Sequence, residues 1–439
     1  MIKKILFLIF LLALFVGCGG ILLDFDKHQR GENPFDPLQP EDPSKEPDGS
    51  WVVMVYLDAA NNLEGAGVAD LQEMVQGSAG IPPSQLTILV LMDRIDGYST
   101  ADGDWKGVRF YKIQDGVPQM MTDAAHRIGG KIFDGTASSE TNMGDPFVLL
   151  EFMKLCITNY AADYYLLDMW NHGGGWRDNP QVSDYSPKKA ICWDDESPGH
   201  DTLYMNEVQQ AFNQIIFTLS TKRNKSRLDV VYMDACLMQM AEVAYELRGL
   251  TKYLVASEET VPGNGGDYND IFTRFKNMAT HNPYMFSYEL VSSFRNQYYS
   301  TADTTQSAIN LDKLDALISA INIFADNLRN QSGSQIKDLR GDTSHFAYPD
   351  QADLYHFAQL CNQNIPGAVG GAAEVMTAIE DMMVKEYHHG ASKPNVHGLA
   401  IYFPPSPGEV KTDYTANPYN IDFISDTRWN DFIKWFKNQ

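Results

Sequence analysis

Two short apolar runs that each lead to a reactive side chain constrain the fold of this chain most. The first lies in residues 163–176 and reaches His172 just before a glycine triplet, and the second lies in residues 228–238 and reaches Cys236. Apolar runs of this length, bounded by glycines or by a helical pattern, predict buried strands. Open α/β sheets keep their active sites where strands give way to loops or helices. We therefore expect a sheet that brings two residues 64 positions apart side by side.

The two reactive residues suit the roles of nucleophile and base. A helical pattern at 238–247 follows Cys236, and a thiolate at the start of a helix is stabilised by the helix dipole. A nearby imidazole such as that of His172 can remove the thiol proton. A lone histidine at a strand end is more often structural. The adjoining Gly173 favours the functional interpretation, because glycine lets a backbone amide approach a ligand closely.

These residues resemble the clostripain family of cysteine peptidases, which are relatives of caspases, gingipains and legumains. The motifs His172-Gly-Gly-Gly-Trp176 and Asp234-Ala-Cys-Leu-Met238 carry the resemblance. Three further stretches look like the same family, at 56–64, 257–268 and 397–404. The resemblance therefore runs from about Trp51 nearly to the C-terminus.

The resemblance implies a caspase-like three-layer α/β/α sandwich with a mainly parallel central sheet. It also implies a cysteine endopeptidase in which Cys236 attacks the peptide carbonyl while His172 takes and returns the proton. In caspase-like enzymes the glycine after the histidine supplies an oxyanion donor beside the cysteine amide. By resemblance Gly173 has that role here. This chemistry requires no cofactor.

Residues near the two motifs are candidates for substrate binding. Asp234 lies two positions before the cysteine, so on a strand both side chains face the same side. By resemblance Asp234 binds an arginine or lysine side chain just before the scissile bond, although an aspartate here could instead cap a helix. The loop with Asp58, Asn61 and Asn62 is a weaker candidate for the cleft wall, because Asn and Asp also form ordinary turns.

The long insertion at 177–227 carries two further expectations. Family members often activate themselves by cutting this region after a basic residue, so Lys188 or Lys189 is a candidate cut site, against the alternative of an exposed polar loop. Calcium dependence is known in the family. The acidic residues at 194–196, Asp194, Asp195 and Glu196, are candidate ligands, but acid-rich loops are common without a metal.

The N-terminal segment reads as an export signal. Two lysines precede twelve apolar residues, too few to span a bilayer as a helix, and Gly17-Cys18 resembles a bacterial lipobox. We expect a signal peptide at 1–17, lipidation of Cys18, a proline-rich acidic tether at 18–50, and the peptidase domain at 51–439. An ordinary signal peptide with an incidental cysteine is the alternative. The expected location is the bacterial cell envelope or surface, as an exported, membrane-anchored lipoprotein.

The charge of the chain limits its partners. The formal net charge is −23, and it becomes −25 without Lys3 and Lys4 of the signal. Nucleic acids and anionic lipids need basic patches, so we expect neither, and contact with the membrane only through the lipid anchor. Protein or peptide substrates with basic residues suit the negative charge, although net charge also serves solubility.

Two other functions compete with the peptidase. His-Gly-Gly-Gly also forms the oxyanion loop of esterases, but those enzymes need a G-x-S-x-G elbow, which this sequence lacks. A catalytically inactive surface lipoprotein could use the same cleft for binding alone. The presence of both Cys236 and His172 argues against that alternative.

Periodicity gives the expected elements and the place of the other cysteines. Strands are predicted at 51–57, 86–92, 108–113 and 396–403, the third of them at an edge of the sheet. Helices are predicted from Asp145 and at 201–217, 238–247, 283–299, 311–328, 353–361, 372–387 and 429–436. Cys156 and Cys361 fit a buried core, and Cys192 fits either the core or a disulfide.

Overall fold

The computed structural model describes residues 46–176, 191–197, 200–301, 303–367, 369–391 and 393–439. The candidate cut sites Lys188 and Lys189 and the candidate lipidation site Cys18 lie outside the described residues, as does the segment 1–17, so these expectations stay predictions. Within the described residues, no helix combines the length and apolar character needed to cross a membrane.

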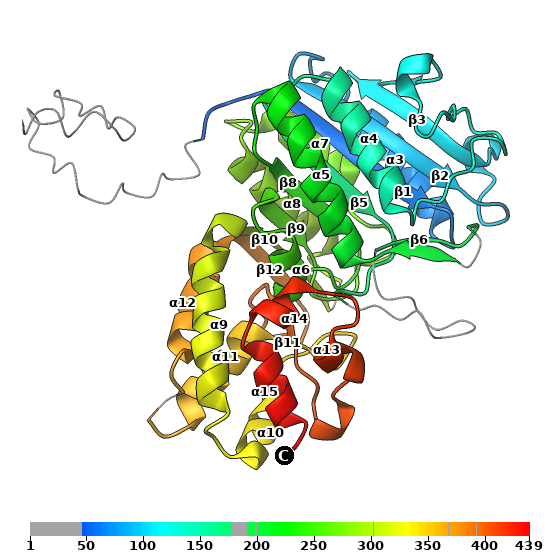
Figure 1. Cartoon of the computed structure of the whole chain (residues 1–439). Coiled ribbons are helices and arrows are strands. Elements are labelled where there is room, and N and C mark those ends of the chain that lie inside the picture. The colour runs from blue at the N-terminus through cyan, green and yellow to red at the C-terminus, as the bar shows by residue number, and fades with distance from the viewer. Residues whose placement is uncertain (1–45, 177–190, 198–199, 302, 368, 392) are drawn as a thin grey trace, which may run out of the picture. The chain divides into compact units, whose positions relative to one another are not determined.

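A nine-stranded sheet organises residues 46–439, in the order β12-β10-β9-β8-β5-β1-β2-β3-β4 (Figure 1). Its five central strands run parallel: β2 (Leu86–Arg94), β1 (Trp51–Ala59), β5 (Tyr164–Trp170), β8 (Leu228–Asp234) and β9 (Thr251–Ala256). Antiparallel strands flank them: β3 (Gly107–Gln114), β4 (Val117–Met120), β10 (Thr304–Asn310) and β12 (Met383–His389). The two strands that lead to His172 and Cys236 are direct neighbours, as expected.

Helices cover both faces of the sheet. On one face lie α4 (Pro146–Asn159) and α5 (Met205–Arg223), and on the other lie α3 (Glu64–Gly77), α7 (Tyr268–Asn277) and α8 (Pro283–Tyr298). Because the central strands are buried on both faces, their sequences are continuously apolar rather than alternating. The predicted three-layer α/β/α sandwich with a mainly parallel sheet is confirmed.

The C-terminal part of the chain adds helices next to the β12 side of the sheet (Figure 1). They are η4 (Leu311–Lys313), α9 (Leu314–Leu328), α10 (Gly333–Asp342), α11 (Leu354–Asn364), α12 (Ala372–Met382), α13 (Thr412–Ala416), α14 (Asp422–Asp426) and α15 (Trp429–Phe436). A small antiparallel pair, β11 (Gln351–Asp353) with β13 (Ala400–Tyr402), links them. The Ala400 amide donates to the Gln239 carbonyl at 3.0 Å, which ties this part to the loop after Cys236.

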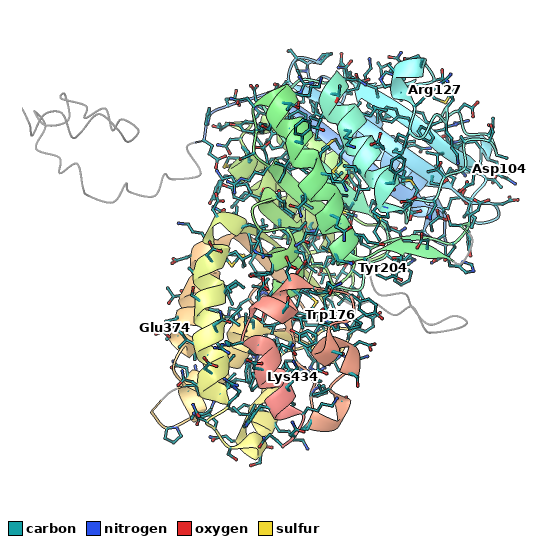
Figure 2. All side chains as sticks on the ribbon, in the orientation of Figure 1. Asp104, Arg127, Trp176, Tyr204, Glu374 and Lys434 are labelled. Carbon is teal, nitrogen blue, oxygen red and sulfur yellow. The ribbon has the colours of Figure 1, made fainter. Side chains whose placement is uncertain are left out.

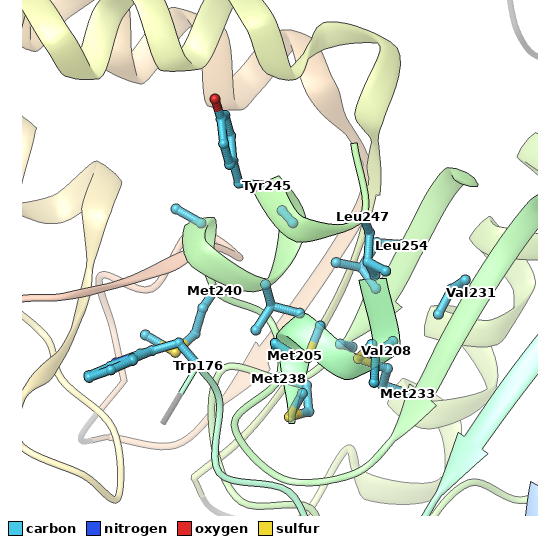
Figure 3. Packing of buried hydrophobic residues seen from close by; sticks show 14 of the residues in the cluster. Trp176, Met205, Val208, Val231, Met233, Met238, Met240, Tyr245, Leu247 and Leu254 are labelled. Carbon is cyan, nitrogen blue, oxygen red and sulfur yellow. The ribbon is translucent and has the colours of Figure 1, made fainter. Parts of the chain in front are cut away.

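Aromatic and methionine side chains fill the space under the loops that follow β5 and β8. Figure 3 shows Met205, Met233 and Met238 gathered below the short helix α6 (Ala241–Glu246). Trp176, labelled in Figure 2, packs edge-on against Tyr414 of the C-terminal part, with ring centroids 4.8 Å apart. The loops near the reactive residues therefore rest on a packed core.

Local signals explain where several helices begin. The Asp145 carboxylate accepts from the Phe147 amide at 2.8 Å and Pro146 occupies the first turn of α4, as predicted. Helix α8 begins in the same way, with Asn282 as the cap and Pro283 in the first turn. The predicted helix at 429–436 matches α15 at both ends.

Some predicted elements differ in the structure, among them the helix predicted at 238–247, which is limited to α6. The strand predicted at 108–113 is not an edge strand, because β4 pairs with it on its outer side. The helix predicted at 372–387 stops at Met382, and its second half forms β12, where tertiary pairing with β10 overrides the helical pattern. The segment 201–217 begins as a strand, β7 (Asp201–Leu203), paired with β6 (Ile191–Asp194). The strand predicted at 396–403 is limited to β13.

The described cysteines are all free. Cys156, Cys192 and Cys361 are buried, which decides the alternative for Cys192 in favour of the core. Burial raises the pKa of the Cys156 thiol well above its usual range, so this group is inert.

A buried ion pair joins the start of α3 to the end of β2, and it gives the first prediction. Glu64 Oε1 lies 2.8 Å from Arg94 Nε, with both side chains fully buried. We expect Glu64→Ala to lower the free energy of unfolding by about 3–5 kcal/mol in urea denaturation, because it leaves an uncompensated buried charge. The control, Glu151→Ala, removes a half-exposed partner of Lys154 and should cost under about 1 kcal/mol. Equal losses would contradict a structural role for Glu64.

Candidate active site

The ends of β5 and β8 lie level with each other. Trp170 pairs with Asp234, and the pairing continues one residue further, where the Asn171 amide donates to the Asp234 carbonyl at 3.3 Å. A Cβ at Gly173 would overlap the Cys236 carbonyl oxygen, so only glycine permits this approach. The structure thus brings the backbones next to His172 and Cys236 together.

The His172 ring is half-buried and oriented by its neighbours. Its Nε2 lies 3.0 Å from Asn62 Oδ1, and the ring packs against Trp193 with centroids 4.8 Å apart. An amide oxygen can only accept, so Nε2 donates and Nδ1 is the basic nitrogen. Burial lowers the pKa of His172, and the charge of Asp195 opposes this in part. The imidazole is therefore a neutral base near pH 7.

A buried amide network holds the segment before His172. Asn171 Nδ2 donates to Asp58 Oδ2 at 2.8 Å, and Asn61 Nδ2 donates to Asn171 Oδ1 at 3.0 Å and to the Trp193 carbonyl at 2.8 Å. Asn171 Oδ1 also accepts from the His172 amide. Asp58 and Asn61 are buried and satisfy their polar atoms inside the protein. The substrate-binding role expected for Asp58, Asn61 and Asn62 stays a prediction.

Cys236 lies in a loop rather than at a helix start, which corrects the expectation from the sequence. Leu237 adopts a left-handed conformation with φ 65°, and helix α6 begins only at Ala241. The helix dipole therefore does not act on the thiol directly. Burial raises the pKa of Cys236, and the Val261 amide, which donates to Sγ at 3.3 Å, lowers it in part.

The loop at 257–268 is pinned over the cysteine loop. The Leu237 amide donates to the Glu259 carbonyl at 3.1 Å, and the Gln239 amide donates to the Ser257 carbonyl at 2.9 Å. A buried ion pair of 2.7 Å between Glu259 and Lys393 fixes the loop from the other side. This loop therefore forms one wall around Sγ.

Asp234 lies beneath the same loop and is 4% exposed. Its Oδ2 accepts from the Gly266 amide at 2.7 Å, and its Oδ1 is buried without a hydrogen-bond partner among the described residues. A Cβ at Gly265, whose φ is +56°, would lie 2.7 Å from Oδ2. The helix-cap alternative is wrong, because Met240 stands at the cap position of α6. Burial raises the pKa of Asp234 to about 6.

A second acidic group gathers near β6. One carboxylate oxygen each from Asp93, Glu140 and Asp194 lies within 4.8 Å of the others. Asp93 Oδ2 and Glu140 Oε1 are buried without a partner among the described residues. Of the acids expected to ligate calcium, Asp194 belongs to this group, whereas Asp195 lies 3.5 Å from His200. Burial, followed by the charge of Glu196, raises the pKa of Glu140 to about 7.

Sequence reasoning missed four residues that shape these sites: Asn171, Trp193, Asp93 and Glu140. The residues of the acidic group are about 50 positions apart, and no spacing rule connects them. Asn171 directly precedes His172, and this adjacency was the one signal in the sequence that could have identified Asn171. The candidate calcium ligands at 194–196 located the region of the acidic group but did not identify Asp93 and Glu140 as its other members.

Comparisons with known proteins identify the family of this chain. A model of the clostripain family matches residues 55–436. Clostripain from Hathewaya histolytica is 31% identical over an alignment of 426 positions, and the match covers 83% of this chain and 76% of that protein.

Two solved structures are similar in fold. A secreted C11 cysteine protease from Bacteroides thetaiotaomicron, in complex with an irreversible peptide inhibitor, has a TM-score of 0.62 at 18% identity, covering 86% of this chain and 98% of that chain. An inactive zymogen C11 protease from Parabacteroides distasonis has a TM-score of 0.57 at 17% identity, covering 88% and 99%. The family match over most of the chain identifies this protein as a member of the clostripain family of cysteine endopeptidases.

Proposed function

We propose that this cysteine endopeptidase cleaves peptide bonds after arginine or lysine. The observation that carries the proposal is the buried carboxylate oxygen of Asp234, Oδ1, which has no partner among the described residues and lies two positions from the nucleophile. A buried charge is costly unless a partner of opposite sign meets it. A cationic substrate side chain would supply that partner.

The surroundings of Asp234 support a cationic ligand. Two more acids, Asp70 and Glu73 of α3, interact electrostatically with this site. Burial first, and the charge of Asp234 second, raise the pKa of Asp70, and the charge of Glu73 adds to the effect of burial on the pKa of Asp234. Within the described residues, no lysine or arginine forms an ion pair with these three acids. The described part of the site is therefore rich in acidic groups without a paired cation.

The proposed chemistry is general-base catalysis by a neutral pair. Burial raises the pKa of the Cys236 thiol and lowers that of the His172 imidazole, so a preformed thiolate–imidazolium pair is disfavoured. Sγ attacks the peptide carbonyl as Nδ1 of His172 takes the proton, and the imidazolium then protonates the leaving amine. The amides of Gly173 and Cys236 hold the oxyanion in this proposal. Water then hydrolyses the acyl-enzyme.

Asn62 has a positioning role in this proposal. Its acceptor oxygen fixes the proton on Nε2 and leaves Nδ1 as the basic nitrogen, which is the part played by the third group of a nucleophile–base pair. Asp58 and Asn61 are buried and support the adjoining segment through Asn171, whereas Asn62 is exposed.

We also propose that the acidic group of Asp93, Glu140 and Asp194 holds a calcium ion. The residues fit, because calcium prefers carboxylate oxygens and two such oxygens are buried here without partners. Asp194 follows Trp193, which packs on the His172 ring. A bound divalent cation would neutralise these charges and hold β6 in the position that supports the base.

Export and anchoring complete the proposal. The sequence features at the N-terminus support removal of residues 1–17 and lipidation of Cys18, and Lys188 or Lys189 is the proposed site of self-cleavage. Labelling of the full chain with a radioactive fatty acid, compared with Cys18→Ser, tests the anchor. Equal labelling of both chains would contradict it.

The second prediction concerns specificity. On matched peptides ending in arginine, lysine or an uncharged residue, the full-length protein should cleave after the basic residues and Cys236→Ala should cleave nothing. Asp234→Asn should lose about 100-fold in kcat/KM on basic peptides, because a desolvated charge pair is lost, and far less on neutral ones. Preference for neutral peptides would overturn the proposed pocket.

Intact mass should show a cut near Lys188 that is absent in Cys236→Ala and in the Lys188→Ala/Lys189→Ala double variant.

The third prediction concerns the base. Asn62→Ala should lower kcat roughly 10-fold with KM within about twofold, because the imidazole loses the group that fixes its tautomer but the pocket is unchanged. Steady-state kinetics on one arginine peptide measures both. Asn142→Ala, which removes a polar side chain bonded to Asp201 instead, is the control. A rise in KM alone would assign Asn62 to substrate binding.

The fourth prediction concerns calcium. Millimolar calcium should raise the melting temperature of the full chain by roughly 2–5 °C, and a chelator should reverse the shift. Glu140→Gln should abolish this shift. Glu374→Gln, an exposed acid on α12 that is labelled in Figure 2, should leave it intact. Equal shifts in both variants would show that calcium acts elsewhere.

A further inference from the structure

A second buried acid lies beside the pocket residue Asp234. Asp168 belongs to β5, and the register of β5 with β8 pairs it with Tyr232, so Asp168 and Asp234 point to the same face of the sheet. Asp168 is 1% exposed. The Tyr268 hydroxyl lies between the two acids, 2.6 Å from Asp168 Oδ2 and 3.1 Å from Asp234 Oδ2.

The number of protons in this arrangement is informative. A tyrosine hydroxyl has one proton, so it can donate to one of the two carboxyl groups only. An ionised carboxylate has none to give in return. If both Asp168 and Asp234 were ionised, one of the two short contacts would join two acceptor oxygens. The geometry therefore favours a proton on one of the two carboxyl groups.

The hydrogen bonds indicate which group carries it. Asp234 Oδ2 accepts from the Gly266 amide at 2.7 Å in addition to its contact with the hydroxyl, and donors of this kind favour the charged form. Oδ1 of both acids is buried without a partner among the described residues, so the short hydrogen bond from the Gly266 amide is what distinguishes Asp234. Burial, followed by the charge of Asp234, raises the pKa of Asp168 well above its usual range.

Among the described residues, the groups around the two acids offer no positive charge to hold a second anion. Those that interact with Asp168 or Asp234 electrostatically are Asp70 and Glu73 on α3, Tyr232 and Cys236 on and after β8, Cys192 on β6, Tyr268 on α7 and Tyr298 on α8. All are acids or neutral groups. Two adjacent anions would repel each other here, and one shared proton removes the repulsion.

We propose that Asp168 is a positioning residue for substrate specificity, acting through Tyr268 on Asp234. In its protonated form Asp168 donates to the Tyr268 oxygen, and the Tyr268 hydroxyl donates to Asp234 Oδ2. This chain keeps the negative charge on Asp234 and leaves its Oδ1 for the cationic side chain of the substrate. The inference rests on the proposed cleavage after basic residues and explains which of two adjacent acids binds them.

The test compares three variants of the full chain on matched arginine and uncharged peptides between pH 5 and 8. Tyr268→Phe should raise KM for the arginine peptide about tenfold with kcat little changed, because Asp234 loses a donor to its charged form. The same loss raises the pKa of Asp234, so the fall in kcat/KM at acid pH should begin about one pH unit higher. Asp168→Ala should likewise raise KM for the arginine peptide and shift the acid fall in kcat/KM to higher pH.

Asp168→Asn is the decisive variant. The asparagine amide can donate to the Tyr268 oxygen as a protonated acid does. On a logarithmic scale, the loss of kcat/KM for the arginine peptide in Asp168→Asn should therefore be at most half of the loss in Asp168→Ala. A structural role alone would lower turnover of both peptides equally without moving the pH profile. That result, or an Asp168→Asn as impaired as Asp168→Ala, would overturn the inference.

Infrared spectroscopy gives a measurement that does not depend on activity. The difference spectrum of wild type and Asp168→Asn at pH 7 should contain the carbonyl stretch of a protonated carboxyl group, and its absence would overturn the inference. The two proposals fail separately. A wild type that does not prefer arginine contradicts the proposed function, whereas a wild type that prefers arginine but lacks this band contradicts only the role of Asp168.

Discussion

The parallel pairing of β5 with β8 is the constraint on which the site depends. Because Trp170 and Asp234 are opposite each other, the chain leaves both strands at the same level, and Gly173 then passes against the Cys236 carbonyl. A register slip of one residue would turn Asp168 and Trp170 to the opposite face. His172, Cys236 and Asp234 are thus positioned by one strand pair, and the surrounding loops lie over them.

Buried acidic side chains are the second physical theme. Acids are not confined to the surface, because Asp58, Asp93, Asp168 and Asp234 all lie in the interior at the same end of the sheet. The buried acid Glu64 is paired with the cation Arg94. Within the described residues, no lysine or arginine forms an ion pair with Asp234 or Asp93, and at these two places we propose cationic ligands.

Much of this could be predicted from the sequence, for physical reasons. Continuous apolar runs identified the central strands, since burial on both faces leaves no alternation, and caps such as Asp145 identified helix starts. The conversion of 383–389 into β12 depends on pairing with β10, and no local pattern encodes it. The same holds for the loop after Cys236, where the left-handed Leu237 delays α6 beyond the start that periodicity predicted. In the site, motifs located His172 and Cys236, but Asn171 and Glu140 are defined only by contacts between distant segments.

Strand β5 and the residues that follow it connect the proposed specificity and the proposed catalysis in a way that the sequence alone does not suggest. Asp168 on β5 contacts Tyr268, whereas beyond the end of the strand Asn171 bonds Asp58 and Asn61, and His172 meets Asn62. The proposed positioning residue Asp168 and the proposed base His172 therefore lie close together along one buried segment. Since the central strand is buried on both faces, a displacement of β5 would disturb both residues together, whereas changes in the outer loops can alter access to substrate without altering these contacts.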